Sequence, residues 1–272
     1  MKGMRGLISA GAAAVVMIGA ASSSAQTASA GSGSRAGAPV EPVVVELFTA
    51  QGCSGCPEAN ALLEGLAGRP GVIALTYAVD YWDYLGWPDT FAQPAFAERQ
   101  RAYQDRLRLR DVYTPQVIID GQRQMPGARD EDIQLAVDEE ADRRVWMPEV
   151  EFRETGDRVG VGSGRAPEGG ADVWLVRYQP GPLIVEVGEG ENRGLEVRHA
   201  NVVREIVNLG EWRGRPILLD LPEAPKPVAK TPIKNGAVAP TTASAPTTAA
   251  PQAETSATPK MNLDDILQRR RA

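Results

Sequence analysis

The chain has 272 residues, of which 24% are charged, and its formal net charge is −6 at pH 7. This acidic balance argues against a nucleic-acid partner, which would require a basic face. Between two unusual ends, residues ~40–222 have a length compatible with one large domain or two small ones.

Residues 1–30 have the order of a secretory signal peptide. Lys2 and Arg5 precede an apolar stretch over 7–21, and small residues follow it. That stretch is shorter than the ~20 residues that a membrane-spanning helix needs, so we expect cleavage rather than an anchor. Cleavage would delete two positive charges and change the formal charge from −6 to −8. We therefore expect a periplasmic or secreted protein without a stable membrane span, beginning with a flexible linker over 31–40.

The segment 41–144 alternates strand and helix patterns, and Asp120-Gly121 is a strong hairpin signal within it. The order of the elements is β-α-β-α-β-β-α. This order is that of the thioredoxin-like fold, an α/β fold with a central sheet and helices on both faces. The expected strands cover about 43–48, 72–79, 114–119 and 122–125, and the helices cover about 57–67, 94–110 and a segment from 129.

The segment 145–222 is different, because its apolar residues alternate with polar ones over short stretches. We expect a small antiparallel β-rich lobe here, with strands at 173–176 and 183–185 joined by a turn at 180–182. The remaining residues, 223–272, are rich in Pro, Ala and Thr. They cannot bury enough apolar surface to offset the entropy of ordering, so a disordered tail is expected.

Cys53-Ser54-Gly55-Cys56 holds the only two cysteines, at the point where the first strand gives way to a helix. The positive end of a helix dipole lowers the pKa of a thiol there and makes it a better nucleophile. Zinc would need four ligands, and the chain offers two thiols and one histidine, so we expect neither a metal nor another cofactor. An exported protein can also keep such a disulfide as a structural staple.

The stretch from Val112 to Gly121, which contains Thr114-Pro115, resembles the proline signature of glutaredoxins and periplasmic disulfide oxidoreductases. In those proteins a cis proline faces the cysteines and lets the preceding backbone pair with an incoming peptide. The resemblance therefore implies that Thr114 and Pro115 bind the partner beside the disulfide.

Residues ~41–222 are also similar, almost end to end, to the secreted family called domain of unknown function 1223. This resemblance implies a thioredoxin-like fold and supplies no established activity. The stretches that carry it are 44–49, 51–57, 79–87, 113–116, 173–178, 190–194 and 201–205.

The sequence thus predicts thiol–disulfide exchange, in which Cys53 forms a mixed disulfide and Cys56 resolves it. The expected partner is a protein or small thiol that carries a thiol or a disulfide. The alternative is a non-catalytic binding or assembly module with the same fold, in which the Cys53–Cys56 disulfide is structural.

Four other side chains are considered for a functional or a packing role. Glu46 is a candidate proton relay for the resolving thiol, although it lies one residue further from Cys53 than thioredoxins place their buried acid. The aromatic loop 81–87 is a candidate hydrophobic rim for unfolded or peptide substrates, but the favoured expectation is that Trp82 and Trp87 cap the core between the two parts of the chain. His199 is expected at the surface or in a satisfied position, and the turn at 189–192 is acidic but lacks the spacing of a calcium loop.

Overall fold

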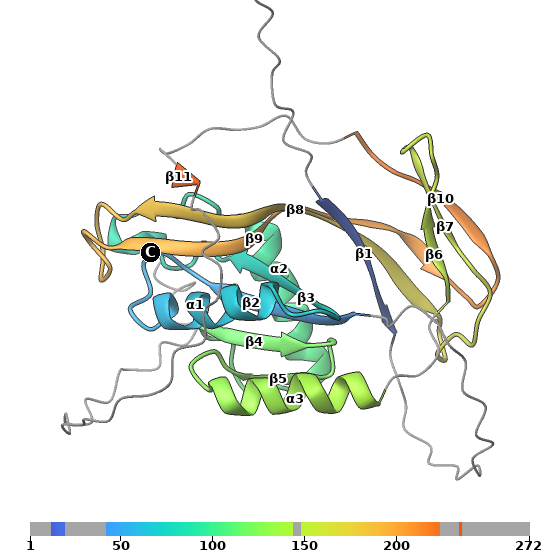
Figure 1. The fold of residues 1–272 in the computed structure, drawn as a ribbon, viewed down its shortest axis with the longest axis horizontal. Coiled ribbons are helices and arrows are strands. Elements are labelled where there is room, and N and C mark those ends of the chain that lie inside the picture. The colour runs from blue at the N-terminus through green and yellow to red at the C-terminus, as the bar shows by residue number, and fades with distance from the viewer. Residues whose placement is uncertain (1–11, 20–41, 144–147, 224–233, 236–272) are drawn as a thin grey trace, which may run out of the picture.

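The computed structural model describes residues 12–19, 42–143, 148–223 and 234–235 (Figure 1). A large mixed sheet is flanked by helices, and a smaller sheet lies beyond one end of its longest strands. In chain order the elements are β1 (Ala12–Gly19), β2 (Val43–Thr49), α1 (Cys56–Ala67), β3 (Val72–Ala78), the 3₁₀ turn η1 (Asp83–Leu85), α2 (Pro94–Leu107), β4 (Gln116–Ile119), β5 (Arg123–Pro126), α3 (Asp130–Asp142), β6 (Val150–Phe152), β7 (Arg158–Val161), β8 (Ala171–Glu186), β9 (Glu196–Trp212), β10 (Ile217–Asp220) and β11 (Lys234–Asn235).

The helices and strands expected between 41 and 144 are present in the predicted order. The large sheet has the strand order β1-β8-β9-β3-β2-β4-β5, in which β2 is parallel to β3 and antiparallel to β4. Successive residues of a strand point to opposite faces, so β2 serves two cores. Val45 and Leu47 pack with the apolar sides of α1 and α3, while Phe48 packs with the side of α2 that carries Phe96.

The predicted hairpin at Asp120-Gly121 is confirmed. Three residues separate the paired Ile119 and Arg123, and Asp120 and Gly121 among them have positive φ, 46° and 63°. The Asp120 carboxylate also accepts the backbone N–H of Val44 at 2.7 Å, which ties the turn to β2.

The expectation of a turn at 180–182 is wrong. The chain continues through it as one 16-residue strand, β8, which pairs antiparallel with the 17-residue β9. The proline-flanked glycine makes a bulge instead: Gly181 has φ +81°, and its N–H donates to Asn201 Oδ1 at 3.3 Å. The Asn201 amide in turn donates to the Ala74 carbonyl at 3.0 Å, so the bulge is fastened to β3.

The β8–β9 hairpin joins the two sheets. β9 pairs parallel with β3 at Val202 and Thr76, which makes the hairpin part of the central sheet. At its other end it packs on the antiparallel sheet β10-β7-β6, where the Trp212 indole is buried and donates to the Gly162 carbonyl at 3.0 Å. The β-rich segment expected over 145–222 is therefore partly a second small sheet and partly an extension of the first.

The predicted signal peptide and tail are described only in short stretches. β1, within 1–30, pairs antiparallel with β8, and β11 pairs with β8 at Leu183 and Ile184. The rest of the predicted leader, the linker over 31–40 and most of 223–272 lie outside the described residues. In the described part of the chain, no helix has the length and apolar character needed to cross a membrane.

Candidate functional site

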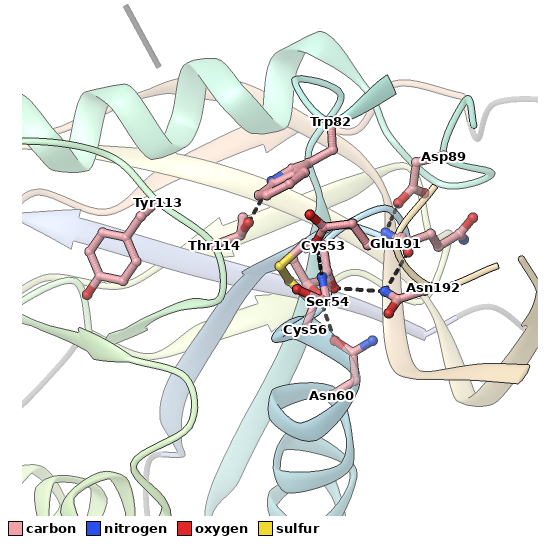
Figure 2. Close-up of a disulfide and its surroundings, with 12 residues drawn as sticks. Cys53, Ser54, Cys56, Asn60, Trp82, Asp89, Tyr113, Thr114, Glu191 and Asn192 are labelled. Carbon is pink, nitrogen blue, oxygen red and sulfur yellow. Dashed lines mark hydrogen bonds between the residues drawn. A yellow bond between two sulfur atoms is a disulfide. The ribbon is translucent and has the colours of Figure 1, made fainter. Parts of the chain in front are cut away.

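The cysteines lie in a turn that connects β2 to α1, which we call the cysteine turn (residues 50–56). Two backbone hydrogen bonds shape it: Cys53 N–H donates to Ala50 O at 3.2 Å, and Cys56 N–H donates to Cys53 O at 3.1 Å. Cys53 and Cys56 form a disulfide with their Cα atoms 5.4 Å apart (Figure 2). Pro57 lies in the first turn of α1, where its missing N–H costs no helical hydrogen bond.

Both cysteines are nearly covered. Cys53 is 3% exposed and Cys56 is 0% exposed, while Ser54 and Gly55 between them are exposed. The sequence predicted Cys53 outside and Cys56 behind it. The prediction of an exposed Cys53 is wrong, because both cysteines are buried.

The loop between β8 and β9, which we call the cap loop (residues 187–195), contacts the cysteine turn. The buried Asn192 amide donates to the carbonyls of Gln51 and Cys53, both at 2.8 Å. The Glu191 carboxylate accepts the N–H of Ser54 at 3.1 Å. At Gly190 the two backbones come so close that an added Cβ would lie 3.8 Å from Gly52 Cα. The cap loop therefore holds the cysteine turn through direct polar contacts.

A buried carboxyl group supports the start of the cysteine turn. Asp89 is 5% exposed and accepts the N–H groups of Gln51 at 2.7 Å and Phe91 at 2.9 Å. Burial raises the pKa of Asp89 to about 6, although these two N–H groups oppose the shift. Trp87 completes the support by donating its indole N–H to Gln51 Oε1 at 2.8 Å.

Thr114 and Pro115 lie against the cysteine turn, and the bond between them is cis. A Cβ added to Gly55 would lie 3.6 Å from Pro115 Cδ, which is van der Waals contact. The Thr114 hydroxyl accepts the indole N–H of Trp82 at 2.7 Å. In Figure 2, Trp82 and Thr114 lie on one side of the turn and the cap loop lies on the other. All four predicted site residues are thus brought together.

Glu46 belongs to a different cluster. Its carboxylate forms a buried ion pair with Arg99, at 2.7 Å from Nε, and accepts the hydroxyl of Tyr103. Burial and the Glu46 charge raise the pKa of Tyr103 well above its ordinary value, so this phenol remains a donor. Glu46 is therefore the carboxylate of a buried ion pair, which is the paired role common for such a residue.

The other side chains singled out in the sequence have packing roles. Trp87 also packs on the cap loop, where a Cβ added to Gly188 would clash with its ring at 2.6 Å. His199 is fully buried, with its ring centroid 5.1 Å from that of Phe91, and burial lowers its pKa to about 4. It is therefore an uncharged interior residue at pH 7. Among the described residues, no group of three or more His, Cys, Asp and Glu side chains is arranged to hold a metal ion.

The sequence did not identify Asp89 or Asn192 as parts of the site. Asn192 lies 139 residues from Cys53, and its signals were its place in the acidic turn at 189–192 and in a family-like stretch between two glycines. Asp89 follows the aromatic loop and carries no motif of its own. Both contribute through contacts that only the folded chain creates.

Comparison with known proteins agrees with the resemblance found in the sequence. The family model described as "Protein of unknown function (DUF1223)" matches residues 44–238. The crystal structure of protein AGR_C_4864 from Agrobacterium tumefaciens, a structural-genomics target, is similar with a TM-score of 0.57 and 33% identity, over 68% of this chain and 80% of that one. HBP35 of Porphyromonas gingivalis matches at a TM-score of 0.36 and 13% identity, over 68% of this chain and 65% of that one, which carries no argument. No curated protein matches.

Proposed function

The chain belongs to the DUF1223 family, whose description names no activity, and we propose from the site itself that it exchanges thiols and disulfides through Cys53 and Cys56. The observation that carries this proposal is the disulfide in the cysteine turn with Pro115 packed against it. Two cysteines one turn apart can open and close a disulfide without moving the rest of the fold.

The sheet supports a thioredoxin-like interpretation of residues 41–144. In the strand order β3-β2-β4-β5, β3 and β2 are parallel, whereas β2 is antiparallel to β4 and β4 is antiparallel to β5. The apolar residues of α1 and α3 share one core with β2, and those of α2 share the other. The cysteine turn follows the carboxyl end of β2, and this end of the strands is where open α/β sheets place their binding sites.

In the proposed reaction, the partner's disulfide is reduced while the Cys53–Cys56 disulfide forms, so the number of disulfides stays the same. The Cys53 thiolate attacks a sulfur of the partner's disulfide, forming a mixed disulfide and releasing one partner thiolate. Cys56, after losing its proton, attacks Cys53 Sγ, which forms the Cys53–Cys56 disulfide and releases the second partner thiolate. Two electrons and two protons pass to the partner. The reverse sequence oxidises a partner dithiol.

The proposed partner is a protein or small thiol that carries a thiol or a disulfide, in the periplasm or outside the cell. The expected leader over 1–30 supports this location, and an oxidising compartment permits the disulfide to persist. Thr114 and Pro115 would hold the backbone of a protein partner, because they lie beside the exposed Ser54 and Gly55.

The test is a trapping experiment with Cys56→Ser. Removal of the resolving thiol should leave mixed disulfides on Cys53, visible as adducts on non-reducing gels and absent after reduction. The matched control, Cys53→Ser, should trap far fewer. A lack of adducts, together with no exchange of the wild-type disulfide with glutathione, would exclude the proposed activity.

The alternative, a binding or assembly module with a static disulfide, is favoured by one observation, the near-complete burial of both cysteines. The reduction potential separates the two functions. A structural disulfide is expected below roughly −300 mV, whereas a redox-active pair lies well above that value.

A further inference from the structure

The cap loop has a fixed shape of its own. Val187 N–H donates to Leu195 O at 3.0 Å, and Gly194 N–H donates to Val187 O at 2.7 Å, which closes the loop at its base. At its tip, Asn192 is 2% exposed and holds two carbonyls of the cysteine turn. A loop fastened at both ends places its other side chains reproducibly.

The side chain that this arrangement places at the motif is Glu191. Its Oε2 accepts the N–H of Ser54, the residue that directly follows Cys53, at 3.1 Å. The nearby Arg193 is paired with Glu189 at 3.8 Å. The cap loop therefore brings a carboxylate to a backbone donor of the cysteine turn.

The hydrogen bond between Glu191 and Ser54 works against the factors that usually make such a cysteine reactive. Thiolates are stabilised by backbone N–H donors and by positive charge. Here the N–H of the residue that follows Cys53 is already engaged by a carboxylate, which adds a negative charge to the cysteine turn.

We propose that Glu191 is a positioning residue for the exchange reaction: it engages the Ser54 N–H, opposes the formation of the Cys53 thiolate and so slows its attack. This inference rests on the proposed function, because it concerns the reactivity of the same cysteine pair. It goes beyond that function by assigning control of the reaction to a loop that lies 137 residues further along the chain.

The experiment uses the full chain with the Cys56→Ser background, so that Cys53 is the sole thiol. The rate of alkylation by iodoacetamide is measured against pH for this protein and for the same protein with Glu191→Gln, Glu191→Asp or Glu189→Gln. Glu191→Gln keeps an acceptor oxygen and removes the charge. Glu189→Gln is the matched control, since Glu189 is exposed in the same loop and pairs with Arg193.

With Glu191→Gln, the pKa of Cys53 should fall by roughly 0.5–1 unit, as expected for one unit charge at short range near a protein surface. The alkylation rate at neutral pH should rise about 3–10-fold, because thiolate is the reactive form. Glu191→Asp should retain most of the wild-type pKa, and Glu189→Gln should leave it nearly unchanged. The effect of Glu191→Gln should shrink in 1 M salt, where the Debye length is ~3 Å.

An unchanged pKa with Glu191→Gln, or an equal change with Glu189→Gln, would overturn the inference. That result is distinguishable from failure of the proposed function. Exchange of the wild-type disulfide with glutathione would still establish the redox pair, whereas a potential below roughly −300 mV and an absence of adducts would remove it. The unfolding midpoint of each variant shows whether the fold is intact.

Discussion

Among the buried polar side chains of the described residues, two clusters are built differently. In the first, the Glu46 carboxylate meets the guanidinium of Arg99 and the hydroxyl of Tyr103. In the second, around the cysteine turn, the carboxylate of Asp89 accepts backbone N–H groups. The first cluster compensates charge with charge, which suits a permanent interior. The second uses neutral N–H donors, and burial raises the pKa of its carboxyl group to about 6 although those donors oppose the shift.

The clusters also differ in where their members come from. Glu46 and Arg99 are 53 residues apart, both within the first half of the chain. Cys53 and Asn192 are 139 residues apart, so the second cluster is complete only when the β8–β9 hairpin is in place. The stability of the first cluster and the accessibility of the second should therefore respond to different substitutions.

The largest expected effect is that of Arg99→Ala. It leaves the Glu46 carboxylate buried without its guanidinium partner, and breaking such a pair costs about 3–5 kcal/mol of unfolding free energy. Urea unfolding measures this loss. Glu98→Gln, on the exposed side of the same helix, should change stability by no more than about 0.5 kcal/mol. A loss below ~1 kcal/mol for Arg99→Ala would show that the first cluster is not held by charge compensation.

A smaller effect is expected from Asp89 and depends on pH. Its pKa rises from about 3.9 in the unfolded chain to about 6 in the folded protein, so the folded state binds this proton more tightly. The stability that it contributes is complete below pH ~4 and is lost as pH rises through about 6, a change of roughly 2–3 kcal/mol.

Urea unfolding of wild type and Asp89→Asn between pH 4 and pH 8 tests this directly. The wild type should lose stability relative to the variant as pH rises over that window. Asp142→Asn, at the exposed end of α3, controls for the removal of a surface carboxylate. A difference between wild type and Asp89→Asn that stays constant with pH would contradict the assignment.

The smallest expected change in stability is that of Asn192→Ala. It removes the donor to two carbonyls of the cysteine turn, at a cost of about 1–3 kcal/mol. Since the cap loop then loses its anchor, reduction of the Cys53–Cys56 disulfide by dithiothreitol should become faster. Asn208→Ala, at an exposed position of β9, should leave that rate unchanged. Equal rates in both variants would mean that the cap loop does not limit access.

The first half of the chain was predictable because its signals are local. The apolar run of β2, the Pro57 that opens α1 and the Asp120-Gly121 turn each determine a nearby backbone. The pairing of the cysteine turn with Thr114-Pro115 was predictable for a related reason, since it follows from a known motif once the strand order is assumed.

The second half was less predictable because its signals are distant. β9 carries charged residues, which are unusual in the sequence pattern of a buried strand. These charges have partners on other elements: Arg198 pairs with Glu64 of α1 at 2.6 Å, and Glu205 pairs with Arg177 of β8. The Pro-Gly-Pro sequence at 180–182 predicts a turn. In the folded chain, however, Asn201 accepts the Gly181 N–H and the strand stays continuous. Such partners become visible only when the fold is known.

The distance in sequence between the cysteine turn and its cap has a consequence for the order of synthesis. Ser54 leaves the ribosome 137 residues before Glu191, which at about 5–20 residues per second is an interval of roughly 7–27 s. During that interval the cysteines exist without the loop that later contacts their turn. The contacts of Glu191 and Asn192 with the cysteine turn can therefore form only after residues 42–143 have been synthesised.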